Sequence, residues 1–192
     1  MKALIVLANE KKEGSFCHAL ADMAKRTLRD AGYEVILRDL YAEHFDPILT
    51  HEELSLSGDE VSGELRAEIE QILATDLFVV IHPNWWGMPP AILKGWIDRC
   101  IRQGFCYAFT ADGPVRMLEG RKAIVFTTGN TPQEIEVSVN HDPLDNLWKN
   151  IVFKTVGIDD CVRMNIASLI MSTPQQREQW LLEAKAELEK LL

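Results

Sequence analysis

The 192-residue chain has few positive charges: 20 Lys and Arg stand against 29 Asp and Glu, a formal net charge of −9. No basic cluster offsets this balance, so a polyanionic partner such as nucleic acid would be repelled. A compact anionic ligand remains compatible with it, because backbone N–H groups at a helix N-terminus bind anions whatever the net charge. No run of about 18 apolar residues is present, so we expect no stable insertion in a membrane.

Cysteine is also scarce. The four cysteines (Cys17, Cys100, Cys106 and Cys161) form no CxxC pair and have no histidine at metal-ligand spacing, so no metal site is predicted. The opening segment MKALIVLANEKK is too short and too soon charged for a signal peptide, and it is more typical of a first β-strand. We therefore expect a cytoplasmic protein with reduced thiols.

Two common nucleotide-binding patterns are missing as well. The chain contains neither GxGxxG nor GxxxxGK[ST]. A dinucleotide-binding fingerprint and a nucleoside-triphosphatase loop are therefore both unsupported.

What the chain does contain is a series of apolar runs separated by segments with helical spacing. The runs are KALIVLA at 2–8, YEVILRDL at 33–40, LFVVIHP at 77–83, KAIVFTTGN at 122–130 and CVRMNIASLI at 161–170. Between and after them, apolar residues at steps of three and four predict helices, among them 59–74, 144–157 and the tail from Thr173. Continuous apolar runs are typical of strands buried on both faces. We predict one α/β domain over 1–192, a doubly wound sheet of five parallel strands.

In a sheet of order 2-1-3-4-5, the winding direction reverses between the first and third strands. Ligands bind at such a point, beyond the carboxyl ends of the strands. The loops NEKKEGSF, PNWWGMPP and TTGNTPQE follow the first, third and fourth strands. We expect these three loops to converge on one site.

The first loop ends in Gly14, Ser15 and Phe16 at the start of a predicted helix. Free backbone N–H groups, the helix dipole and the Ser15 hydroxyl favour a bound anion such as a phosphate. An ordinary capped helix has the same pattern, so this loop alone leaves both interpretations open.

The second loop is unusually aromatic for the end of a buried strand. Trp85 and Trp86 lie among Pro83, Pro89 and Pro90, which stiffen the backbone. Stacking a flat ring on an aromatic side chain contributes about 0.5–1.5 kcal/mol beyond burial. The alternative is that the tryptophans anchor the core, although one of two adjacent tryptophans must point outward.

The third loop, Thr127 to Asn130, offers hydroxyl and amide groups without charge, and a simple turn would look the same. Together the three loops describe a ligand with a phosphate end and a broad, planar, hydrogen-bonding end. Flavin mononucleotide (FMN) fits this description. The aromatic loop is then a platform for its isoalloxazine ring.

These residues resemble the NAD(P)H:quinone oxidoreductase family, DT-diaphorase and its shorter bacterial-type relatives, within the flavodoxin-like fold. The resemblance covers nearly the whole chain. It includes ALIVLA and the SF helix start, DLYAEHFDPIL, PAILKGWIDR with GFCYAF, and TTGN.

The resemblance implies a flavin that carries hydride through N5 from NAD(P)H to a quinone or similar small aromatic acceptor. It also implies a ping-pong, two-electron cycle and a homodimer with its active site at the subunit interface. The implied flavin contacts are Asn9, Ser15, Phe16 and Cys17 around the phosphate, Pro83, Asn84, Trp85, Trp86 and Gly87 along the isoalloxazine, and Thr127, Thr128, Gly129 and Asn130 at its pyrimidine edge. The amides of the last three residues would stabilise negative charge on the reduced ring. Tyr107 and Phe109 would wall the pocket for nicotinamide or quinone, from their own or the partner subunit.

Some positions depart from the larger diaphorases. Cys17 stands where the family usually has Asn, Trp85 where it has Gln, and Ile135 where it has a catalytic Tyr. His141 falls at the spacing of the catalytic histidine and is the candidate for that role, with a surface or interface position as the alternative. The long carboxyl-terminal extension is missing, which favours FMN, with FAD as the alternative.

Two other functions remain open. One is a flavodoxin-type one-electron carrier, against which the tryptophan pair, PAILKGW and GFCYAF indicate a substrate pocket and a dimer. The other is a flavin-bound regulatory subunit of a potassium-efflux system, docked on a membrane transporter through the apolar segment 41–49. We favour dimer packing as the use of that segment.

Overall fold

Five parallel strands form the central sheet, in the order β2-β1-β3-β6-β7. The computed structural model describes residues 1–192 apart from the side chain of Asp59. The strands are β1 Lys2–Leu7, β2 Glu34–Asp39, β3 Leu77–Pro83, β6 Lys122–Thr128 and β7 Asp160–Ile166. The predicted flavodoxin-like order 2-1-3-4-5 is confirmed, although the last strand ends at Ile166 rather than at residue 170.

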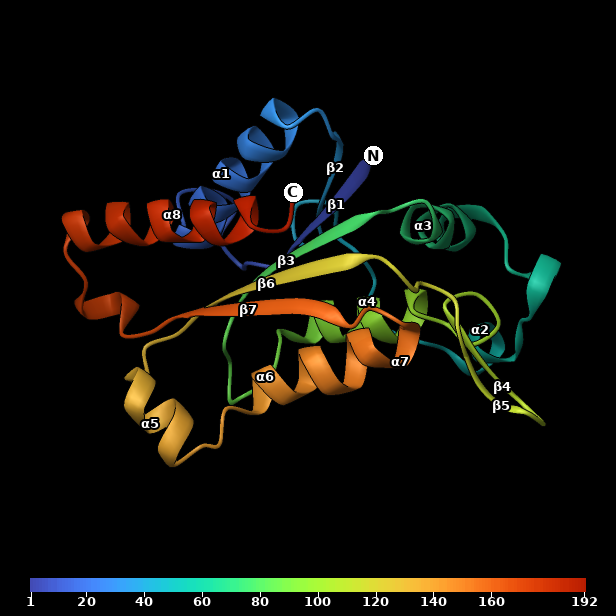
Figure 1. The fold of residues 1–192 in the computed structure, drawn as a ribbon. Helices are drawn as coiled ribbons and strands as arrows, with labels where there is room; N and C mark the ends of the chain where they lie inside the picture. The colour runs from blue at the N-terminus through green and yellow to red at the C-terminus, as the bar shows by residue number, and fades with distance from the viewer.

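Helices cover both faces of this sheet (Figure 1). On one face lie α1 Phe16–Asp30 and α8 Pro174–Glu189; on the other lie α3 Gly63–Leu73, α4 Ala91–Cys100 and a continuous helical segment made of α6 Pro143–Asn146, the π-helix η2 Leu147–Phe153 and α7 Lys154–Val156. Along β1, Ile5 and Leu7 pack under α1 and α8, while Leu4 and Val6 pack on the opposite side. Successive strand residues point to opposite faces, which is why the apolar runs are continuous.

The predicted helix over 59–74 begins later than expected, at Gly63. A short 3-10 turn, η1 Gly58–Glu60, precedes it. The backbone is extended at Val61 and Ser62, so the turn and the helix cannot join. The other short helices are α2 His51–Ser55, α5 Gln133–Ser138 and the 3-10 turn η3 Leu169–Met171.

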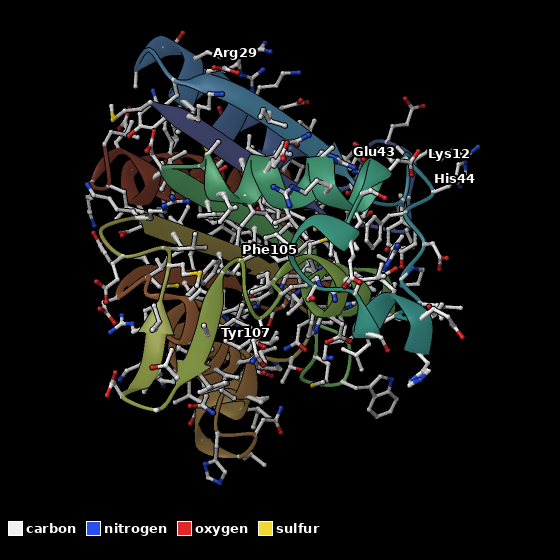
Figure 2. The ribbon with its side chains drawn as sticks, turned by 90° about the vertical axis from the view of Figure 1, so that its right-hand side faces the viewer. Lys12, Arg29, Glu43, His44, Phe105 and Tyr107 are labelled. Atoms are coloured by element: carbon white, nitrogen blue, oxygen red, sulfur yellow. The ribbon has the colours of Figure 1, made fainter. Side chains whose placement is uncertain are left out.

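The segment 104–116, which has no alternating strand pattern, contains an antiparallel hairpin of β4 Tyr107–Thr110 and β5 Gly113–Arg116. Figure 1 shows this hairpin at one end of the sheet and α5 at the other, where the strands have their carboxyl ends. Figure 2 looks at the hairpin end and labels Tyr107 there.

The apolar segment after β2 packs largely on its own chain. Tyr41 and Phe45 contact the core, and the Arg99 guanidinium lies 5.2 Å from the centre of the Phe45 ring. Pro47 lies directly against Gly95 of α4, so closely that a Cβ at Gly95 would clash with the Pro47 backbone. Ile48 remains exposed. None of the helices formed by the described residues combines the length and hydropathy needed to cross a membrane.

Candidate active site at the carboxyl ends of the strands

Two adjoining cavities lie where the three loops meet. The first has a volume of about 360 Å³ and the second about 530 Å³, and both are lined by Asn84, Gly129 and Asn130. The first is otherwise lined by Asn9, Glu10, Lys11, Gly14, Ser15, Phe16, Cys17, Pro83, Trp85, Thr128, Leu169, Ile170 and Arg177; the second by Trp86, Gly87, Thr131, Glu136, Asn140 and Pro143. The loops after β1, β3 and β6 therefore converge, as the strand order requires.

The first cavity opens onto the N-terminus of α1. Ser15 caps this helix: its hydroxyl accepts the backbone N–H of His18 at 3.2 Å. The N–H groups of the first turn, those of Phe16 and Cys17, have no partner inside the helix. Gly14, at φ +72, turns the loop into the helix. This end of the cavity can hold an anion such as a phosphate.

Cys17 forms part of the floor of the first cavity. Its Sγ atom lies 3.4 Å from Oγ1 of Thr128, and its side chain is buried. Burial raises the pKa of the Cys17 thiol. The group is therefore a neutral thiol at neutral pH, not a reactive thiolate.

The loop after β3 is a tight turn with Trp86 at its tip. Trp85 and Met88 exchange two backbone hydrogen bonds of 3.0 Å, and Trp86 and Gly87 between them have φ values of +57 and +71. Positive φ at both central residues defines a type I′ turn, in which a bulky side chain is strained. Trp86 is fully exposed, at 101%, whereas Trp85 is 39% exposed. Trp86 is therefore not a core anchor.

A buried carboxylate holds this loop in place. Glu136 of α5 accepts hydrogen bonds from Nδ2 of Asn84 at 2.9 Å and from Nδ2 of Asn140 at 3.1 Å. Oδ1 of Asn84 in turn accepts the Gly87 N–H at 2.9 Å. Because every polar atom of the Asn84 side chain is used, its orientation is determined and the turn is locked against α5.

A buried histidine orients the strand just before the loop. His82 lies between Pro83, whose carbonyl is 2.8 Å from Nδ1, and Trp148, whose Nε1–H donates to Nε2 at 2.9 Å. Burial lowers the pKa of His82 to about 4. The ring is therefore neutral, with its proton on Nδ1 and directed at the Pro83 carbonyl.

The loop after β6 differs in detail from the expectation. The Gly129 N–H donates to the Ile166 carbonyl at 2.9 Å and is not free for a flavin, because β7 runs alongside. Thr127 is fully buried, and its hydroxyl bonds to Asn165 rather than lining either cavity. Within the described part of the chain, the N–H groups of Asn130 and Thr131 have no hydrogen-bond partner, and both residues line the second cavity. These are the free donors of this loop.

A model of the flavodoxin-like fold family matches residues 1–192. The chain belongs to this family. It is 31% identical to an uncharacterized NAD(P)H oxidoreductase of Haemophilus influenzae, over 96% of this chain and 100% of the relative. An FMN-dependent NADH:quinone oxidoreductase of Shewanella loihica is 30% identical, over 100% of this chain and 98% of the relative. The crystal structure of Smu.1420 from Streptococcus mutans superimposes with a TM-score of 0.86 at 28% identity, covering 99% of this chain and 100% of that one. The resemblance noted from the sequence is confirmed.

Besides Thr127, three predicted site residues of this flavodoxin-like chain lie outside both cavities. Tyr107 and Phe109 are on the hairpin at the opposite end of the sheet (Figures 1 and 2). Their rings pack edge to face, with centroids 5.8 Å apart. Phe109 is exposed. His141 is exposed in the loop after α5, with φ +58, and lines neither cavity.

Several lining residues were missed by sequence reasoning. Glu136 and Asn140 sit on and after a short helix that has no motif, and only the fold turns them toward the loop of Asn84. Arg177 comes from α8, after the last strand, and reaches the first cavity through the chain reversal at η3. The segment TPQEIEVS gives no signal for a buried Glu136, because its apolar residues Ile135 and Val137 are the ones expected inside, yet both are exposed.

Proposed function

We propose that this protein is an FMN-dependent NAD(P)H:quinone oxidoreductase. The observation that carries the proposal is the pair of adjoining cavities, one ending at a capped helix N-terminus and the other beside an exposed tryptophan on a locked turn. Their volumes are in the ~300–1,000 Å³ range of small-molecule sites. The relative in Haemophilus influenzae is named an NAD(P)H oxidoreductase, and the one in Shewanella loihica an FMN-dependent NADH:quinone oxidoreductase.

The residues present fit FMN. Ser15 and the first-turn N–H groups of α1 would bind the phosphate, and the positively charged Lys11 and Arg177 line the same cavity. Trp86 would cover one end of the ring system, and the free N–H groups of Asn130 and Thr131 would bind the oxygen atoms at its edge. When bound, FMN supplies the chemistry: hydride accepted at N5 from NADH or NADPH and two electrons passed to a quinone, in a ping-pong cycle.

The protein supplies orientation and electrostatics rather than proton transfer. The N–H groups of Asn130 and Thr131 favour negative charge at the ring edge, because they are already fixed and need no reorganisation. The neutral His82 lies fully buried behind the loop, and the carboxylate of Glu136, which lines the second cavity but is itself buried, holds the loop through Asn84. His141, as an exposed residue, would act only in an assembly that brings the second substrate against it.

A homodimer completes the proposal. Trp86 is exposed beside one cavity, and Ile135 and Val137 are exposed on the neighbouring helix α5. Tyr107 and Phe109, exposed or partly exposed at the far end of the same chain, would wall the substrate site of the partner copy. A reducing, cytoplasmic location remains a prediction from the sequence.

The test is cofactor analysis followed by kinetics. Purified protein is denatured by heat, and the released flavin is identified by chromatography, with FMN expected. NADH or NADPH oxidation is then followed with menadione as acceptor, and parallel lines in double-reciprocal plots are expected for a ping-pong cycle. A protein that neither retains nor binds added FMN would refute the proposal. A protein that binds FMN but oxidises neither nicotinamide would favour the one-electron carrier.

A further inference from the structure

The Ser15 hydroxyl can donate its single proton either to His18 or to a ligand in the cavity. Its Oγ atom lies 2.5 Å from Nδ1 of His18, and it also accepts the backbone N–H of His18. A hydroxyl has one proton to donate. While Nδ1 of His18 is unprotonated, it accepts the hydrogen bond from the Ser15 hydroxyl. Ser15 then has no proton to donate to an oxygen atom in the cavity.

Asp39 decides which nitrogen of His18 carries the proton in the neutral ring. Its Oδ2 atom lies 3.8 Å from Nε2 of His18, and both side chains are about four-fifths buried, with 18% and 19% exposed. Nε2 itself is buried and has no hydrogen-bond partner. A carboxylate beside Nε2 favours a proton there, since the other tautomer would turn a nitrogen lone pair toward negative charge. Nδ1 is thus left as the acceptor that holds the Ser15 proton.

We propose that His18 takes up a proton when a flavin with a phosphate binds, and that it is the positioning residue that favours FMN over flavins without phosphate. This inference rests on the proposed function. A proton from solvent adds to Nδ1, the imidazolium N–H then donates to Oγ of Ser15, and the Ser15 hydroxyl donates to a phosphate oxygen. Ser15 is then fully satisfied as donor and acceptor. The positive ring offsets one negative charge of the phosphate, and only hydrogen bonds and one solvent proton have changed.

The surrounding charges are suited to this uptake. Asp39 is the charged group paired with His18, at 3.8 Å. The other charged residues on the elements around it are Asp22 one turn along α1, Glu43, which pairs with Arg38, Glu10, Lys11 and Lys12 in the first loop, and Arg177, which lines the cavity from α8. Figure 2 shows Lys12 and Glu43 at the same edge of the molecule. The Asp39 carboxylate stabilises an imidazolium. Lys11 and Arg177 line the cavity and attract the phosphate. The negative charge of the phosphate then favours the added proton on Nδ1 of His18.

Proton uptake is measured directly by calorimetry. Protein stripped of flavin is titrated with FMN at pH 7.5 in buffers of different ionisation enthalpy, and riboflavin, which lacks the phosphate, is the matched ligand. We expect the wild type to take up a fraction of a proton, at most about one, with FMN and none with riboflavin. His18→Gln should take up none with either ligand, whereas His44→Gln, changed at an exposed site, should behave as the wild type.

The affinity and a second variant complete the test. Above pH 7 the wild-type affinity for FMN should fall by up to about ten-fold per pH unit, and that of His18→Gln should stay flat, because FMN is already a dianion there. Asp39→Asn removes the preference for a proton on Nε2, so FMN should bind with reduced uptake.

Three results would overturn the inference: equal uptake in wild type and His18→Gln, no uptake with FMN, or the same uptake with riboflavin. If His18→Gln does not fold, the riboflavin comparison and Asp39→Asn decide. Failure of the wild type to bind FMN at all would instead refute the proposed function, so the two failures are distinguishable.

Discussion

At the scale of single residues, Trp86 combines two features that rarely occur together. It is a bulky aromatic in the left-handed region of the backbone, and it is fully exposed. Such a conformation costs about 1–2 kcal/mol in a non-glycine residue, and it persists only where the surroundings impose it. Here the Trp85–Met88 bonds and the Asn84–Glu136 contact impose it. Strain kept at an exposed aromatic points to function rather than to stability.

Trp86→Asn is predicted to separate the effect of Trp86 on stability from its effect on FMN binding. Asn followed by Gly is the preferred type I′ turn, so the variant should raise the free energy of unfolding by up to about 1 kcal/mol. Loss of ring stacking and apolar contact should weaken FMN binding about ten-fold. Chemical denaturation and fluorescence titration with FMN measure the two effects. Trp86→Ala should lose affinity similarly, and unchanged FMN affinity in both variants would contradict the platform assignment.

His82 predicts how stability depends on pH. Its folded-state pKa of about 4 lies below its ordinary value of 6.5, so the unfolded chain binds the proton first as the pH falls. The free energy of unfolding should therefore decrease as the pH falls from about 6.5 to about 4, with about 2 kcal/mol of this loss present at pH 5. Urea denaturation at pH 7 and pH 5 measures it.

The matched variant is His82→Gln, which keeps an acceptor for the Trp148 N–H but does not titrate. Between pH 7 and pH 5 its free energy of unfolding should fall by about 2 kcal/mol less than that of the wild type. The exposed His44→Gln should leave the wild-type profile unchanged. Identical profiles in all three proteins would show that His82 is not buried as a neutral ring.

At the scale of elements, the segment after β2 packs closely against helix α4 because Gly95 has no side chain. Gly95 has the backbone of Pro47 where its Cβ would lie, and Arg99, one turn further, donates to the Asp46 carbonyl at 2.5 Å. Arg99 also pairs with Glu53 of α2 at 2.8 Å. This contact explains why the motif PAILKGW and the apolar segment around DPI occur in one chain.

Gly95→Ala should destabilise the protein by about 2 kcal/mol, because the added methyl group forces Pro47 away from α4. The gain in helix propensity, up to about 1 kcal/mol, offsets only part of this. The thermal unfolding midpoint measures the effect, and Lys94→Ala on the exposed side of the same helix is the control. A midpoint for Gly95→Ala at or above that of the wild type would mean that Pro47 does not pack there.

The π-helix η2 has a related role. It interrupts regular α-helical spacing between α6 and α7, and it carries Trp148 to its bond with His82. π-helical turns often occur near functional sites. Here the turn connects the helical layer to the carbonyl of Pro83 and hence to the aromatic loop.

At the scale of the whole molecule, the two cavities and the aromatic hairpin lie at opposite ends of the sheet. The cavities open at the carboxyl ends of the strands, and the aromatic hairpin lies at the opposite end (Figure 1). Residues so placed act at the same site only if two copies pack with one hairpin near the other copy's cavities. The proposed homodimer would bring these two ends together.

Phe109→Ala tests the dimer at the level of function. If the hairpin of one copy walls the cavity of the other, the variant should lower kcat/KM for quinone several-fold while FMN binding stays unchanged. Steady-state kinetics and sedimentation of wild type and variant measure this, with Val115→Ala on the paired strand as the control. A monomeric wild type with full activity would contradict it.

The sequence by itself determined a parallel α/β sheet, and the flavodoxin-like order 2-1-3-4-5 then predicted the convergence of three loops. Apolar runs of strand length, separated by helix-period segments, allow few arrangements, and the reversal of winding sets the binding edge. Ser15 as helix cap and the outward position of a tryptophan also followed from local chemistry alone, because capping and turn geometry depend on neighbouring residues.

Only the tertiary structure decided which polar groups are free. Gly129 has its N–H taken by Ile166, and Thr127 turns its hydroxyl to Asn165, because β7 lies beside β6. Glu136, Arg177 and Asp39 reach the site or its cap from distant parts of the chain. Hydrogen-bond partners far apart in sequence show no recognisable spacing. The donors that are free for a ligand are therefore known only from the folded structure, in which the others are already paired.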